Sequence, residues 1–156
     1  MNVLKKRGHQ ELIIIVLRFA IGAVFLWFGI DKWIHPDAWY GWIPAWLWPL
    51  LPLKPDTFLW LNGAFEFVVG VLFVGGRLLR PASVVAGAFL FVITVTLGAS
   101  EVTVRDTALI GSCLALFLHE NAKARRPVPS NIVSTACSLY VLFLFVYGVL
   151  YLRSGA

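Results

Sequence analysis

Charged residues are scarce in this chain of 156 residues, of which 13% are charged and 60% are apolar. A soluble domain carries about 25% charged residues, so a soluble chain of this size would lack the polar side chains needed to cover its core. The same composition excludes a disordered, a collagen-like and a disulfide-rich protein. The sequence therefore predicts an integral membrane protein whose main partner is the lipid bilayer.

Cysteine is also scarce, because Cys113 and Cys137 are the only two and each lies inside an apolar run. The sequence has no CxxC pair, no cluster of cysteine and histidine and no glycine-rich phosphate loop. We therefore expect no metal site, no thiol relay and no covalently bound cofactor. The net charge of +5 is scattered between apolar runs, which favours charged membrane loops over a nucleic-acid surface.

Long apolar runs dominate the chain, and most approach the ~20 residues that a helix needs to cross a bilayer. The fourth predicted span is the weakest candidate for crossing, because its uninterrupted apolar part, Thr107–Leu118, is short. To cross, this helix must begin near Val102 and carry Arg105 and Asp106 below the membrane surface; the alternative is a half-helix that does not cross. The five predicted spans are Leu12–Ile34, Thr57–Gly75, Pro81–Gly98, a segment ending near Leu118, and Ile132–Leu152.

The loop charges predict the orientation of these helices. Cytoplasmic loops carry an excess of lysine and arginine. Five spans divide the loops between the two sides of the membrane. Arg18 is not counted, because it lies within the first span. The loops on one side then carry about twice as many basic residues as the loops on the other. We predict a cytoplasmic N-terminus and a C-terminus on the outer side. The richer face carries Lys5, Lys6, Arg7, Arg77, Arg80, Lys123, Arg125 and Arg126, and the poorer face carries Lys32, Lys54, Arg105 and Arg153.

The first outer loop, His35–Pro55, is rich in tryptophan and proline. Tryptophan favours the membrane interface, where its ring is buried and its N–H stays hydrated. Proline forbids a long helix here, so we expect short helical turns lying flat over the bundle. Two interpretations stay open, a plain aromatic belt or a lid over an outward-facing cavity. The tryptophans concerned are Trp39, Trp42, Trp46 and Trp48.

Several charged residues fall inside the predicted spans, where they are costly and usually face the bundle interior. In the first helix a stripe with two glycines runs from Arg18 to Lys32, and Asp31 adjoins its outer end. In the second helix Glu66 lies near the middle, between Gly63 and Gly70. Counting residues from the ends of the apolar runs places Arg18 and Glu66 about 5 Å apart in depth. We therefore predict an Arg18–Glu66 ion pair, either as structural support or as a proton or substrate contact.

The third predicted helix carries a similar stripe, which we extend from Gly87 through Gly98 to Glu101 and Arg105. Asp106 follows, and capping the fourth helix is its favoured role. Convergent charges under an aromatic cover are typical of a small-molecule site. The candidate ligand-binding residues are Arg18, Asp31, Lys32, Glu66, Glu101, Arg105, Asp106, Trp39, Trp42 and Trp46. Of these we expect Lys32, Glu66, Glu101 and Arg105 to line one outward-opening cavity.

These residues carry a resemblance to a known family. The stretches RFAIGAVFLWFGIDKW, NGAFEFVVGVLFVGGRLLRPAS and VRDTALIG resemble the DoxX-like family of small bacterial four-helix membrane proteins. The resemblance covers Leu12–Leu118, so a fifth helix departs from the usual four. It implies an all-α integral membrane protein of the bacterial inner membrane, forming one domain over 1–156. Residues 11–120 form the four-helix core, and 130–153 add a C-terminal transmembrane helix.

The functional implication of the resemblance is broader. Some relatives resemble the quinone-reducing membrane subunit of thiosulfate oxidation, and others are linked to membrane oxidoreductase assemblies and oxidative-stress responses. We therefore predict a component of a membrane redox system that binds a quinone-like or other small apolar molecule. Whether the protein is itself an enzyme stays open. The alternatives are an accessory subunit with a membrane or periplasmic protein partner, and a carrier of a small solute or lipid. The fifth helix either packs on the rim of the core or mediates a homo-oligomer.

Overall fold

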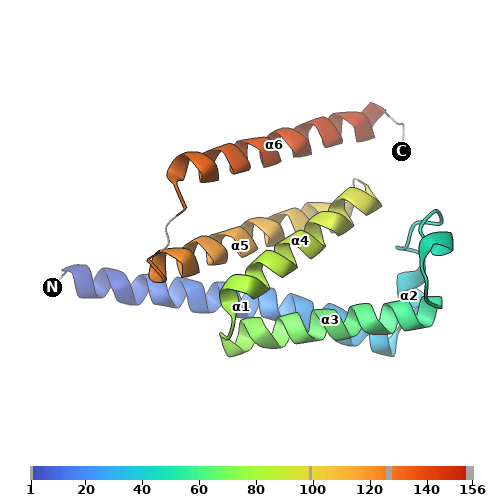
Figure 1. Cartoon of the computed structure of the whole chain (residues 1–156), viewed down its shortest axis with the longest axis horizontal. Helices are drawn as coiled ribbons and strands as arrows, with labels where there is room; N and C mark the ends of the chain where they lie inside the picture. Colours follow the sequence, from blue (N-terminus) through green and yellow to red (C-terminus); the bar gives the residue numbers. More distant parts are fainter. Residues whose placement is uncertain (1, 99, 126–127, 154–156) are drawn as a thin grey trace.

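The fold is all-helical in the part of the chain that a computed structural model describes (Figure 1). The backbone is described for residues 2–98, 100–125 and 128–153, and the side chains for 10–98, 100–125, 128–142 and 145. In chain order, the elements are α1 (Asn2–Ile34), α2 (Asp37–Tyr40), the 3-10 turn η1 (Trp48–Leu50), α3 (Pro55–Gly75), α4 (Leu79–Leu97), α5 (Glu101–Lys123) and α6 (Ser130–Arg153).

Four helices are long and apolar enough to cross a membrane, within the described residues. They are Gln10–Ile34 of α1 together with the whole of α3, α4 and α5. The fourth helix begins at Glu101, so the prediction that Arg105 and Asp106 lie inside it is confirmed. The helix predicted as a fifth span is present as α6, whose side chains are described only in part. Its crossing of the membrane stays a prediction.

Helices α1 and α3 pack closely through glycines, as their sequence stripes predict. A methyl group on Gly29 would lie 2.7 Å from the backbone nitrogen of Phe67, and one on Gly70 would lie 2.8 Å from the backbone nitrogen of Leu26. Only glycine permits such a close approach of two helix backbones. This packing joins α1 and α3 into one antiparallel pair.

Helices α4 and α5 form the second pair, joined by a short turn. Gly98 has a positive φ of 77°, and Ser100 begins α5 with a capping box in which its hydroxyl accepts from the backbone N–H of Thr103. The prediction that Asp106 caps this helix is therefore wrong, because the chain turns earlier and a serine reaches the free N–H groups. The stripe drawn from Gly87 to Arg105 also breaks at Gly98.

The two pairs form a V (Figure 1). They lie close where α3 turns into α4, and they diverge toward the end that carries α2. The buried core, which includes Phe25, Phe73 and Leu116, fills the narrow part. The loop between α1 and α3 consists of short helical turns at the wide end, as its prolines predict.

Helix α6 lies outside the V (Figure 1). The Tyr140 hydroxyl, 3.5 Å from the carbonyl of Thr107, links it to α5. The described apolar side chains of α6 are mostly exposed, among them Leu139 and Val141.

Candidate functional site

A cavity of about 470 Å³ occupies the wide end of the V. Its size lies within the range typical of small-molecule sites. All four helices of the two pairs and the loop between α1 and α3 line it, and most of the lining is apolar. Its polar side chains are Asp31, Lys32, Asn62, Glu66, Thr96, Arg105 and Asp106.

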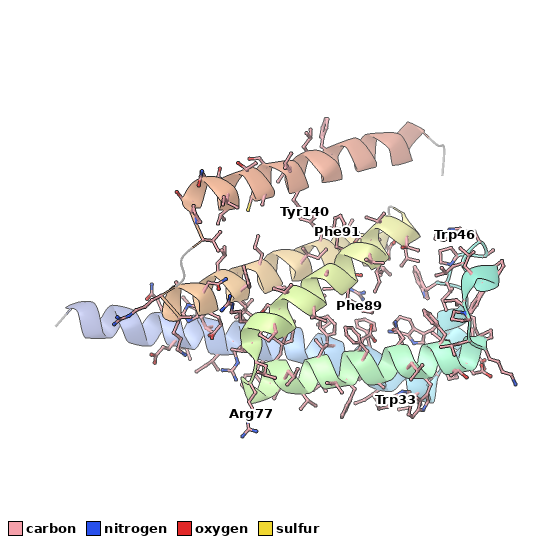
Figure 2. All side chains as sticks on the ribbon, viewed as in Figure 1. Trp33, Trp46, Arg77, Phe89, Phe91 and Tyr140 are labelled. Atoms are coloured by element: carbon pink, nitrogen blue, oxygen red, sulfur yellow. The ribbon has the colours of Figure 1, made fainter. Side chains whose placement is uncertain are left out.

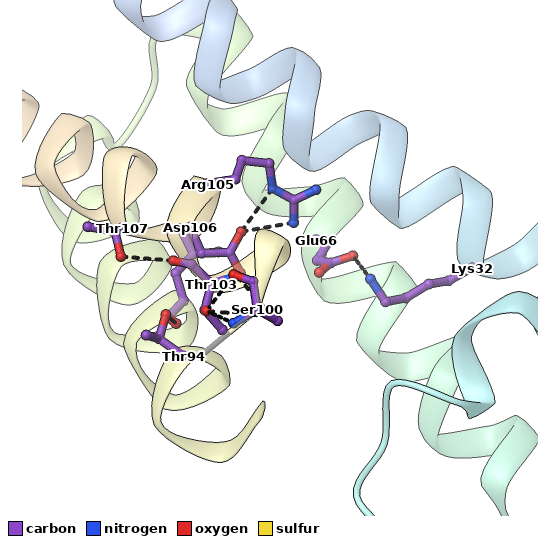
Figure 3. Close-up of polar contacts among 9 residues, drawn as sticks. Lys32, Glu66, Thr94, Ser100, Thr103, Arg105, Asp106 and Thr107 are labelled. Atoms are coloured by element: carbon purple, nitrogen blue, oxygen red, sulfur yellow. Dashed lines mark hydrogen bonds and ion pairs between the residues drawn. The ribbon is translucent and has the colours of Figure 1, made fainter. Parts of the chain in front are cut away.

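A buried ion pair between Lys32 and Glu66 forms one wall of the cavity. Lys32 Nζ lies 2.5 Å from Glu66 Oε2, and both side chains are 7% exposed (Figure 3). Lys32 comes from the last turn of α1 and Glu66 from the middle of α3, so the pair joins the two helices. The same Nζ lies 3.8 Å from the centre of the Trp39 ring. The ammonium therefore contacts a carboxylate and an aromatic face together, which compensates part of its lost hydration.

A second charged pair, Arg105 and Asp106, faces the first from α5 (Figure 3). Arg105 donates to one oxygen of Asp106 from Nε at 3.1 Å and from Nη2 at 2.9 Å. The Asp106 side chain is 2% exposed, whereas that of Arg105 is 42% exposed. The Arg105 guanidinium carbon also lies 4.4 Å from the centre of the Phe28 ring. Arg105 is therefore the more accessible of the two cations that line the cavity.

Trp39, on α2, ties the loop to the charged wall. Its indole N–H donates to Asp31 Oδ2 at 2.9 Å, and its ring meets Phe28 edge to face. Trp39 and Trp42 line the cavity, as the lid interpretation expects. Trp46 and Trp48 do not line it: Trp46 is exposed, and Trp48 contacts the ring of Tyr40.

The predicted Arg18–Glu66 ion pair is wrong. Arg18 instead donates from Nε to the carbonyl of Phe73 at 3.1 Å and from Nη2 to that of Val74 at 3.0 Å. These carbonyls belong to the last turn of α3, where the regular hydrogen bonds of the helix interior end and a cation is favoured. The carbonyl of Phe73 also accepts from the backbone N–H of Gly76. Glu66 lies ten residues before Gly76, against which the guanidinium packs, and that is about 15 Å along the helix.

Glu101 also lies outside the predicted site. It occupies the first turn of α5, is exposed, and does not line the cavity. The prediction extended the stripe of α4 straight through Gly98, but the turn there gives Glu101 a different direction. Most of the other lining residues were not predicted, and Phe28 and Asn62 are the two that the sequence could have marked. Each lies one helical turn before a predicted site residue, Lys32 or Glu66, and that spacing marks the same helix face.

The described side chains contain no group of three or more histidine, cysteine or acidic residues that could hold a metal ion. Cys113 is buried in the core between α4 and α5, and Cys137 is exposed on α6. Cys113 acts as a small packing residue, since its Cβ lies 3.6 Å from where a methyl group on Gly87 would be.

The fold and the cavity together define a multi-span helical membrane protein with two charged pairs enclosed between two helix pairs. The family model for DoxX matches residues 13–99, which is more than half of the chain and runs from α1 to the end of α4. The chain belongs to the DoxX family. Arg105 and Asp106 lie beyond the matched residues. Comparisons with curated proteins and with solved structures gave no match.

Proposed function

We propose that this protein is a component of a membrane redox system that binds a quinone-like or other small, largely apolar molecule in the cavity. The observation that supports it best is the buried Lys32–Glu66 pair, which lines the cavity at its charged wall. Ionisable residues at membrane depth are costly and are retained chiefly at functional sites. A pair serving only to join two helices has no need to line a cavity.

The lining fits a ring-shaped head with polar substituents. Lys32 and Arg105 carry N–H donors for a carbonyl oxygen, and Asn62 carries both a donor and an acceptor. Apolar residues such as Phe58 and Leu109 supply the walls. A quinone, when bound, supplies the capacity to accept two electrons and two protons. This chain would bind and orient its head and exclude water from it, and electrons would come from a partner or a substrate.

The cellular setting of the proposal is the bacterial inner membrane. The excess of basic residues on one set of loops orients the N-terminus toward the cytoplasm and the C-terminus toward the periplasm. In that orientation the wide end of the V and the cavity lie on the periplasmic side. A periplasmic or membrane-bound donor of electrons would approach the first outer loop.

Co-purification tests the proposal directly. The full-length protein is purified in mild detergent, its visible and ultraviolet spectrum is recorded, and bound small molecules are identified by mass spectrometry. We expect a quinone-like molecule at near-stoichiometric amount. The double variant Lys32→Met/Glu66→Leu should lose it, whereas Lys54→Met, the same change at an exposed lysine, should retain it. Equal retention by both variants would contradict the assignment of the site.

An accessory subunit is the second candidate, and the position of α6 favours it. Its described apolar face is exposed and α6 lies outside the two helix pairs, so it is available to a membrane partner or to a second copy. A co-purifying protein that is lost when α6 is deleted, with no small molecule bound, would support this function. An empty monomer would leave a carrier of small solutes or lipids as the remaining alternative.

A further inference from the structure

The cavity reaches the protein surface at Val92 of α4, on the side where α3 and α4 face each other, and we infer an apolar opening there. At one end of this opening Phe65 and Phe89 pack with ring centres 4.8 Å apart and close the gap between the helices. Beyond them the helices diverge toward the outer loop (Figure 1). Val92 of α4 lines the cavity and is 61% exposed, so it stands at the rim. Phe58 and Asn62 line the cavity from α3.

The side of the cavity that faces outer water is covered. Trp39, Trp42, Ile43, Pro44 and Leu47 of the first outer loop line it there. The loop is held by hydrogen bonds from Trp39 to Asp31 and from Tyr40 to Asp56. Figure 2 shows the dense side chains of this loop at the wide end of the V and Phe89 on the α4 side of the gap. An apolar molecule dissolved in the bilayer therefore meets fewer obstacles than one arriving from water.

The charges of the cavity select against an anionic head. Its lining has three carboxylates and two cations, and each cation is already paired with a carboxylate. The third carboxylate, on Asp31, accepts hydrogen bonds from His35 and Trp39. An anion entering here would be buried without a free cation, which is costly at membrane depth. An uncharged head that accepts hydrogen bonds leaves both pairs intact.

We propose that the ligand is an amphiphile with an uncharged, hydrogen-bond-accepting head, and that its hydrocarbon tail passes between α3 and α4 into the outer leaflet. The head lies beside Lys32 and Arg105, and the tail leaves past Val92. This inference rests on the proposed function, because it names the class of molecule that the same cavity takes and the route by which it enters. It adds a lipid-side opening as part of the site.

Photolabelling locates the tail. The probe is a dimethoxy-methyl-benzoquinone head with a ten-carbon tail that carries a diazirine close to the ring, added to the full-length protein in lipid nanodiscs. After irradiation, adducts are mapped by mass spectrometry with and without an excess of the unlabelled decyl analogue. We expect competed adducts on Phe58, Asn62 and Val92. If the adducts suppressed by the unlabelled analogue lie on the outer loop instead, the route between α3 and α4 is wrong. An excess of decyl phosphate should not compete, and competition would overturn the uncharged head.

A matched pair of variants tests the opening itself. Val92→Phe enlarges a rim residue, whereas Val85→Phe makes the same change seven residues earlier on nearly the same face of α4, at an exposed site that does not line the cavity. Calorimetry at fixed detergent should show about tenfold weaker binding of the decyl analogue to Val92→Phe, because the larger ring would occupy part of the tail's route, and unchanged binding to Val85→Phe. Equal affinities would overturn the inference. If the wild type shows no saturable binding and no competed adduct, the proposed function itself fails.

Discussion

Replacing only one residue of the Lys32–Glu66 pair should lower the free energy of unfolding far more than replacing both. The two groups lie 2.5 Å apart and are 7% exposed, so a single replacement leaves its partner charged in a nearly dry site. Removing one partner of a buried pair costs about 3–5 kcal/mol, whereas replacing both with apolar residues of similar volume is often neutral. We therefore expect Lys32→Met and Glu66→Leu each to lower the free energy of unfolding by that amount.

The double variant Lys32→Met/Glu66→Leu should lie within about 1 kcal/mol of the wild type, because no unpaired charge is left behind. The resulting coupling energy, about 5 kcal/mol or more, would exceed what contacting residues usually show. Equilibrium unfolding of the full-length protein in mixed micelles measures all four free energies. Lys54→Met is the matched control, since Lys54 is exposed and its loss should change stability by less than about 0.5 kcal/mol.

Additive effects of the two single replacements would refute this reasoning. Additivity would mean that the two side chains do not depend on each other, and that the contact seen between them contributes nothing specific. A double variant as unstable as the worse single variant would also refute it, because the cost would then come from lost packing and not from an unpaired charge.

Three further predictions concern contacts of single residues, and a fourth concerns the orientation of the chain in the membrane. Arg18→Leu removes both donors to the end of α3 and should cost about 1–3 kcal/mol in the same unfolding assay. Gly29→Ala should disrupt the α1–α3 contact and lower the free energy of unfolding, whereas Gly111→Ala should not, because a Cβ at Gly111 has no neighbouring atom within 4 Å. Ser100→Ala should cost about 1 kcal/mol and speed amide hydrogen exchange in the first turn of α5. A reporter fused after Ala156 should be active only in the periplasm, and cytoplasmic activity would mean an even number of crossings.

The number of core helices could be predicted from the sequence because apolar length is a property of each segment alone. The fourth helix shows this well: its apolar part is short, yet the requirement to cross places its start near Val102, and the helix begins at Glu101. The loop between α1 and α3 was likewise predictable from its prolines. These features depend on local chemistry and not on which helix faces which.

The placement of individual charges was harder, because it depends on turns and on pairing between helices. Glu101 was assigned to the cavity by continuing one stripe across Gly98, and a single residue with positive φ removes it. Asp106 was assigned to a cap, but it lies inside α5, and the cap is formed by Ser100 just before the helix. The cavity still contains Lys32, Glu66 and Arg105. Lys32 and Glu66 belong to helix faces whose glycines mark them as packed, whereas Arg105 is partly exposed.

The pairing of Lys32 with Glu66 follows from the glycines once two helices are taken as antiparallel neighbours. Gly22 faces Gly70, and Gly29 faces Gly63, so the numbers of facing residues add to 92 in both contacts. Side chains on a helix lean toward its N-terminus, so in an antiparallel pair two long side chains meet when their numbers add to more than this value. The numbers of Lys32 and Glu66 add to more than 92, so their side chains lean toward each other. The numbers of Arg18 and Glu66 add to less than this value, so their side chains lean apart, and Arg18 donates instead to the carbonyls of Phe73 and Val74 at the end of α3. Depth counted from the ends of apolar runs cannot make this distinction, whereas the glycine register combined with side-chain direction makes it from the sequence alone.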